Sequence, residues 1–253
     1  MYRARQRDDE LSAEQRERLA AGRHEAVARE LHSAGKAAAA GWVLEQIWDF
    51  EGALAAYLEA GLGLDSLRVA LEVPDPTSFE RALKIIKDAP DGERQAAIEM
   101  LKRRGRHLDI ARLLESDSSS IDARALALRQ GGDKLAAART LAEAGQVAQA
   151  LSSLGPLKGP GQVPARALAA RLAWELGDAE ATARHAQAAL REGYSAADTD
   201  DLERLLGRAL ASLGHDLAAQ IAAHGLEPES ARSQLHGRYH VRRTLPSTIA
   251  GAA

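Results

Sequence analysis

The chain has 253 residues, of which 45% are hydrophobic but only 4% are aromatic. Alanine and leucine, two strong helix formers, supply most of the apolar share, so the composition predicts an all-α protein. The net charge of −3 provides no long-range field that would attract nucleic acid or an anionic membrane, and the lack of cysteine excludes a disulfide framework and a thiolate nucleophile.

The chain carries no export or membrane signal that we recognise. Its first residues lack the apolar core of a signal peptide, and no run approaches the roughly 18 apolar residues of a membrane span. The lack of cysteine also fits a reducing compartment. We therefore expect a soluble, cytoplasmic protein with no membrane partner.

The first predicted helix begins after Ser12. Together with Gln15, three residues later, Ser12 forms a capping box, in which each side chain accepts a backbone N–H at the helix start. Val27 and Leu31 continue the helical spacing of apolar residues. This pattern predicts a single helix that runs to about Ala34.

Most of the aromatic residues fall in the next predicted helical hairpin. Trp42, Trp48, Phe50 and Tyr57 lie within 16 residues of sequence. Aromatic side chains supply much of the buried area in alanine-rich packing, so a core role is the first interpretation, and an exposed binding anchor is the alternative. The candidate protein-binding residues are Trp42, Trp48, Tyr57 and, in a later helix, Trp174.

One helix of this hairpin occurs twice in the chain. The segment 48–61 recurs as 131–145, and aligning the two places Asp49 on Asp133. In both copies an acidic residue opens the helix, alanines permit close packing, and glycine ends it. Such a helix cannot bury its apolar stripe alone, which predicts a stacked helical array.

Proline-containing breaks separate the helices predicted in the middle of the chain. The breaks lie at 74–76 and 90–92, because proline cannot continue a helix. The helices expected around them are 62–73, 77–86, 96–101, 108–115 and 121–130.

A basic cluster lies between two of these helices. It consists of Lys102, Arg103, Arg104, Arg106 and His107. Such a cluster can bind phosphate, but it lacks interleaved aromatic residues, so we favour a cationic helix C-terminus that complements the helix dipole. No nucleic-acid partner is expected.

The segment 155–164 is the best internal boundary, because its glycines and prolines would interrupt any helix. Helices at 165–177, 178–193, 199–213 and 215–223 are predicted after it. The expected fold is an all-α, irregular α-solenoid of stacked antiparallel helix pairs. Its helical-repeat domain spans 1–235, with sub-blocks 1–154 and 165–235.

The helix pairs resemble tetratricopeptide-type repeats. Gly177 and Asp178 at a turn, with Ala189 and Leu190 near the end of the second helix, match that family's pattern. The second helix of the pattern is also matched by Asp49, Ala53, Tyr57 and Ala60. The resemblance covers about 36–225 and implies a right-handed, tetratricopeptide-like stack that binds other proteins and brings no catalytic residues.

The last residues resemble the start of bacterial serine/threonine protein kinases. The matching residues are Gly237, Arg238 and Tyr239 at the opening, Val241, Arg243 and Leu245 as an alternating strand, and Gly251 as the last loop glycine. Pro246 and Thr248 replace the first two glycines of the phosphate loop, so ATP binding is not expected. The resemblance implies that 236–253 is a tail, separate from the helical stack, that begins a degenerate kinase-like domain.

No group of residues forms a recognisable reaction centre. His236 and His240 have a four-residue spacing, but in a segment that reads as extended, and the acids at 198–203 suit a helix start. The sequence therefore predicts no catalytic, cofactor or metal site.

The expected function is that of a non-catalytic interaction scaffold or regulatory helical-repeat domain of a larger bacterial protein. Its partner would be a protein segment or another domain of that parent, and self-association into a homo-oligomer stays open. The alternative is the N-terminal regulatory part of a serine/threonine kinase or pseudokinase.

Overall fold

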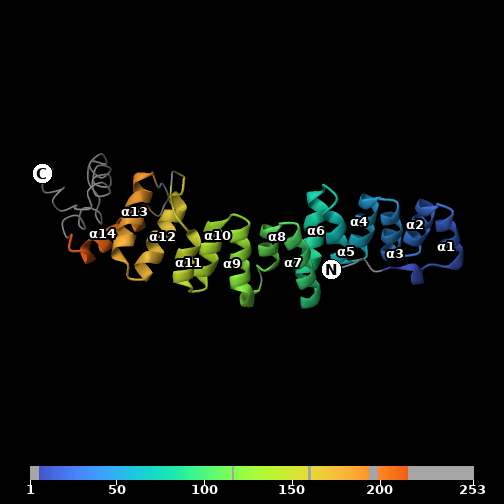
Figure 1. The fold of residues 1–253 in the computed structure, drawn as a ribbon, viewed down its shortest axis with the longest axis horizontal. Coiled ribbons are helices and arrows are strands. Elements are labelled where there is room, and N and C mark those ends of the chain that lie inside the picture. The colour runs from blue at the N-terminus through green and yellow to red at the C-terminus, as the bar shows by residue number, and fades with distance from the viewer. Residues whose placement is uncertain (1–5, 116, 159–160, 194–198, 216–253) are drawn as a thin grey trace. The chain divides into compact units, whose positions relative to one another are not determined.

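The computed structural model describes residues 6–115, 117–158, 161–193 and 199–215. Within these residues the structure is all-α, and no strand occurs among them (Figure 1). The chain divides into two compact units, Met1–Ser116 (unit 1) and Asp117–Ala253 (unit 2). Within each unit neighbouring helices pack against one another, which confirms the prediction of an all-α, solenoid-like fold.

Unit 1 is a succession of short helices that pack in chain order. Each helix lies against the next, and α4 also contacts α6, α5 contacts α7 and α6 contacts α8, as stacked pairs do. Its helices are α1 (Ala13–Ala20), α2 (His24–Ser33), α3 (Ala37–Gln46), α4 (Phe50–Glu59), α5 (Gly63–Ala70), α6 (Pro76–Lys87), α7 (Asp91–Arg103) and α8 (His107–Leu113).

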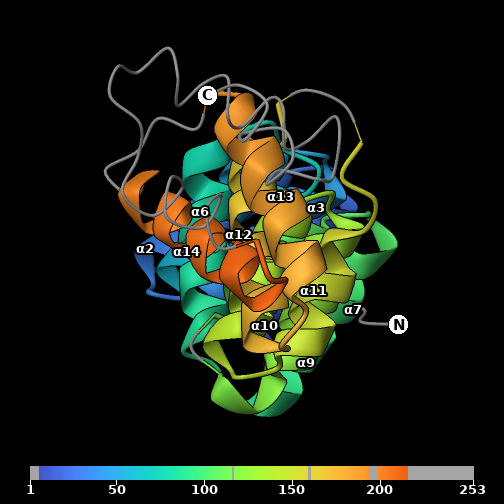
Figure 2. The same cartoon turned by 90° about the vertical axis from the view of Figure 1, so that its left-hand side faces the viewer.

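Unit 2 repeats this arrangement with longer helices at its end. Consecutive helices again pack together, and α14 contacts both α12 and α13 (Figure 2). The predicted boundary at 155–164 lies inside this unit, where α11 packs against α12. The helices are α9 (Ile121–Gln130), α10 (Lys134–Glu143), α11 (Val147–Leu154), α12 (Val163–Glu175), α13 (Ala179–Arg191) and α14 (Thr199–Ser212).

The N-terminal region forms two helices where one was predicted. The capping box is confirmed: the Ser12 hydroxyl accepts the Gln15 N–H at 3.1 Å, and the Gln15 side chain accepts the Ser12 N–H at 2.9 Å. The prediction of one continuous helix was wrong, because Gly22 adopts a left-handed φ of 78° and ends the first helix. The chain can then fold back, so that the Gln15 amide donates to Glu30 of α2 at 2.9 Å.

The duplicated helix is present in both units, as α4 and α10. The Asp49 carboxylate accepts the Gly52 N–H at 2.9 Å, and Asp133 accepts the Ala136 N–H at the same distance. The alanines aligned by the repeat, Ala53 and Ala137, are fully buried. Acidic caps and buried alanines therefore have the roles that the repeat predicts for them.

A close helix contact fixes the hairpin that carries the aromatic residues. A Cβ atom added to Gly41 of α3 would lie 2.9 Å from Tyr57 Cε1 and 3.2 Å from the carbonyl oxygen of Ala53 in α4. Only glycine permits this approach, since such distances are shorter than van der Waals contact. The α3–α4 pair is therefore held together by a glycine facing an aromatic ring.

Several predictions concern residues outside the described part of the chain. These are the helix at 215–223, beyond its first residue, and the tail at 236–253 with its kinase resemblance. The alternative function as part of a kinase rests on that tail and stays a prediction.

Candidate protein-binding groove

The four candidate aromatic residues have different surroundings. Trp48 is 79% exposed, whereas Tyr57 is only 1% exposed and belongs to the core of unit 1. Trp42 is half-buried against the α2–α3 core, and Trp174 is half-buried with the Arg208 guanidinium 4.8 Å from the centre of its ring. Tyr57 therefore has the core role of the first interpretation and is removed from the binding candidates, and Trp48 is the most exposed of the four.

Trp48 has an unusual backbone conformation. Its φ of 63° is left-handed, and among the described residues it is the only one other than glycine with a positive φ. It occupies the C′ position of a Schellman turn: Trp48 N–H donates to the Glu45 carbonyl, and Asp49 N–H donates to the Leu44 carbonyl, both at 3.1 Å. A bulky residue here costs about 1–2 kcal/mol, because its Cβ crowds the backbone.

Other turns of unit 1 place glycine at this position. Gly22, Gly35, Gly61 and Gly105 each have a left-handed φ and precede a residue whose N–H donates to the carbonyl five positions earlier. The turn therefore requires a left-handed residue but no side chain. Trp48 is an exception that the backbone alone does not explain.

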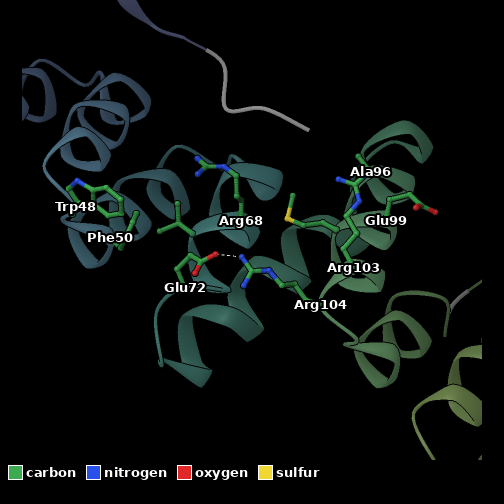
Figure 3. A pocket seen from close by; sticks show the side chains of 10 residues that line it. Trp48, Phe50, Arg68, Glu72, Ala96, Glu99, Arg103 and Arg104 are labelled. Atoms are coloured by element: carbon green, nitrogen blue, oxygen red, sulfur yellow. Dashed lines mark hydrogen bonds and ion pairs between the residues drawn. The ribbon is translucent and has the colours of Figure 1, made fainter. Parts of the chain in front are cut away.

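Beside Trp48 lies a groove with a volume of about 890 Å³, hereafter the Trp48 groove (Figure 3). The Trp48 and Phe50 rings meet edge to face with their centres 5.8 Å apart. The apolar lining consists of these two rings with Val69, Ala96 and Met100, and the charged lining consists of Arg68, Glu72, Glu99, Arg103 and Arg104. The groove thus combines an aromatic side with a charged side, both within unit 1.

Two of the three arginines in the groove are held by acids of unit 1. Arg68 forms a bidentate pair with Glu45, with nitrogen–oxygen distances of 2.7 and 2.5 Å, and Arg104 pairs with Glu72 (Figure 3). Burial lowers the pKa of Arg68, but the hydrogen bond and charge of Glu45 outweigh this effect, and the net pKa is raised. The Arg68 guanidinium therefore stays charged, and both arginines already have an acidic partner within unit 1.

Arg103 differs from the other two arginines. It is exposed in the last turn of α7, and no acid among the described residues forms an ion pair with it. Glu99, one turn earlier, has Lys102 as its partner, with Nζ and Oε1 3.9 Å apart. Arg103 therefore presents an unneutralised positive charge to the groove.

The other arginines of the predicted basic cluster are engaged within unit 1. Arg106 Nε lies 2.6 Å from Asp109, and its guanidinium lies 4.3 Å from the centre of the Phe79 ring. With Arg104 bound to Glu72 as well, the cluster does not form the continuous row of free cations that a nucleic-acid backbone prefers.

A smaller groove of about 360 Å³ lies between α2, α3 and α4. Within it the His32 and Glu59 side chains are in hydrogen-bond contact, with Nε2 and Oε2 2.7 Å apart. Apart from aliphatic residues its wall is polar, and its lining contains no Trp, Tyr or Phe. The Trp48 groove therefore has the stronger features of a binding site.

The fold and the groove together define an all-α protein of stacked helices with one exposed, backbone-strained tryptophan at a partly charged groove. Comparison with protein-family models, curated proteins and solved structures gives no match. The tetratricopeptide and kinase resemblances therefore rest on sequence motifs. None of the described helices has the length and apolar character needed to cross a membrane.

Sequence reasoning named Trp48 but missed its partners in the groove. Met100 and Val69 appear in the sequence as ordinary apolar positions of their helices, and Arg103 as one member of a basic cluster. The pairs that distinguish Arg103 from Arg104 join residues far apart in the chain. No local sequence pattern predicts these ion pairs.

Proposed function

We propose that this chain is a non-catalytic protein-interaction module, and that the Trp48 groove holds a segment of a protein partner or of another domain of its parent protein. The single observation that supports this proposal most strongly is Trp48, a large aromatic side chain kept 79% exposed in a left-handed conformation. Strained backbone at a surface position is a feature of functional sites, because the fold itself gains nothing from it. Exposed tryptophan is also enriched among residues that dominate protein binding.

Photo-crosslinking from position 48 tests this function directly. Trp48 would be replaced by p-benzoylphenylalanine in the full chain, and the matched control would carry the same residue in place of Leu126, which is 51% exposed on α9 of unit 2. After irradiation in a lysate of the source cells, we expect a discrete protein adduct from position 48 that is absent from position 126. Identical adducts at both positions, or none at either, would contradict the proposal.

A further inference from the structure

We propose that the occupant of the Trp48 groove is an acidic and apolar peptide segment, which packs a large apolar side chain against Trp48 and places a carboxylate on Arg103. This inference rests on the proposed function and specifies the partner's chemistry. It follows from two features of the groove, the unsupported aromatic side chain and the unpaired cation.

The aromatic side of the groove requires an apolar side chain from the occupant. Trp48 and Phe50 contact each other through a ring edge, which leaves most of the Trp48 surface in water. Met100 and Ala96, which are partly exposed, extend this apolar surface along the groove, and Val69 is already buried. Burial of such surface by a partner is favourable in proportion to the area removed from water, and aromatic anchors contribute most of it.

The charged side of the groove favours a partner segment with negative charge. Glu45 neutralises Arg68 and Glu72 neutralises Arg104, so among the three arginines that line the groove it is Arg103 that no described acid pairs with. A carboxylate can form two parallel hydrogen bonds with a guanidinium group. An approaching lysine or arginine would instead be repelled, which is a form of specificity.

Charge also argues against two other occupants. The tail 236–253 contains Arg238, Arg242 and Arg243 and no acidic residue, so it has the same sign as Arg103. A nucleic acid could stack a base on Trp48, but its backbone needs several free cations in a row, and Arg104 and Arg106 are already paired. A short acidic peptide needs only one cation.

Selection from a random dodecapeptide phage library with the full chain tests the inference. We expect the selected peptides to be enriched in Asp or Glu within a few residues of Leu, Phe or Trp. Fluorescein-labelled copies of the best peptide should then lose about thirtyfold in affinity with Trp48→Gly, the loss typical of an interface hot spot. Arg103→Glu should abolish the preference for acids and select basic residues instead.

Matched controls separate the groove from general effects. Arg129→Glu reverses a charge at an equivalent place, the exposed last turn of α9, and Leu126→Ala removes an exposed apolar side chain from the same helix. Both variants should bind the labelled peptide within about twofold of the parent chain, because ordinary surface positions contribute little to binding.

Fluorine NMR locates the bound peptide. The chain has three tryptophans, so labelling with 5-fluorotryptophan yields three signals, and Trp48→Gly identifies the one from position 48. Titration with the selected peptide should shift that signal and leave those of Trp42 and Trp174 nearly unchanged. Shifts in the other two signals alone would overturn the assignment to this groove.

The possible outcomes distinguish this inference from the proposed function. Selected peptides that lack acids, or that still bind the Arg103→Glu chain equally well, overturn the acidic partner but leave an interaction module. No selected peptide together with no crosslink from position 48 overturns both. A dimer in sedimentation that Trp48→Gly dissolves, or oligodeoxythymidine binding that needs Arg103, assigns the groove to a second copy or to nucleic acid instead.

Discussion

The α3–α4 turn and the α9–α10 turn have the same hydrogen bonds but different residues at the left-handed position. Asp49 N–H donates to Leu44 in the first and Asp133 N–H donates to Leu128 in the second, at 3.1 and 2.9 Å. The left-handed residue is Trp48 with φ 63° in one turn and Gly132 with φ 90° in the other. The same backbone therefore forms with no side chain at all, so the turn itself does not require the indole.

The helices that follow these turns differ at their central buried position. Tyr57 in α4 and Leu141 in α10 are aligned by the repeat and are 1% and 5% exposed. The Tyr57 ring packs against Gly41, and burial together with the side-chain hydrogen bond to Glu45 raises the pKa of its hydroxyl. The copy beside the groove is thus linked through Glu45 to Arg68, and the other copy is purely apolar at this position.

Removing these central side chains should have the largest effect. Tyr57→Ala should lower the free energy of unfolding by about 3–5 kcal/mol and Leu141→Ala by about 2–5 kcal/mol, because each leaves a cavity in a packed core. Urea denaturation followed by circular dichroism measures both. A loss below about 1 kcal/mol for Tyr57→Ala would contradict the burial of the ring.

Placing tryptophan at the left-handed position of the α9–α10 turn tests whether Trp48 is strained in the α3–α4 turn. Gly132→Trp should lower the free energy of unfolding by about 1 kcal/mol, because the cost of a left-handed conformation for a bulky residue is partly offset by the smaller freedom of tryptophan in the unfolded chain. No atom outside the turn lies within 4 Å of a Cβ built at Gly132, so a steric clash does not confuse the result. Gly132→Asn is the matched control and should cost less, because asparagine tolerates this conformation. An unchanged stability would mean that Trp48 is not strained either.

The two copies should also respond differently to alkaline pH. Because the pKa of Tyr57 is raised in the folded chain, the unfolded chain loses this proton first, and stability falls once the pH exceeds the ordinary tyrosine pKa of about 10. By pH 11 this single group should cost about 1.4 kcal/mol. Tyr57→Phe should remove that part of the decline, and Leu141→Phe serves as the control. Parallel stability curves for the parent and Tyr57→Phe chains would refute the linkage.

Replacing Trp48 by glycine, the residue found in the other turns, should have the smallest effect on stability. Trp48→Gly should raise the free energy of unfolding by about 0.5 kcal/mol, since relief of backbone strain is partly offset by the greater freedom of glycine in the unfolded chain. Thermal melting with the Leu126→Ala chain as the control detects the change. If Trp48→Gly stabilises the chain and abolishes peptide binding, Trp48 serves binding and not stability. If the variant is clearly destabilised, Trp48 supports the fold.

Much of the fold follows from local sequence patterns. The alanine-rich composition, the capping box at Ser12 and the acidic caps Asp49 and Asp133 act within a few residues, and each is present in the structure. The break at Gly22 was missed because apolar spacing continues through it. The reversal at Gly22 also brings α1 against α2, and that tertiary contact leaves no mark on the apolar spacing.

The groove depended far more on tertiary structure. Local sequence determined that Trp48 and Tyr57 belong to one hairpin, but only the packing of α3 against α4 buries the Tyr57 ring at Gly41 while Trp48 stays exposed. The sequence likewise contains the three groove arginines without indicating their partners, because Glu45 lies 23 residues from Arg68 and Glu72 lies 32 residues from Arg104. Which guanidinium remains without a partner is decided by distances across stacked helices, because electrostatic pairing depends on separation in space and not along the chain.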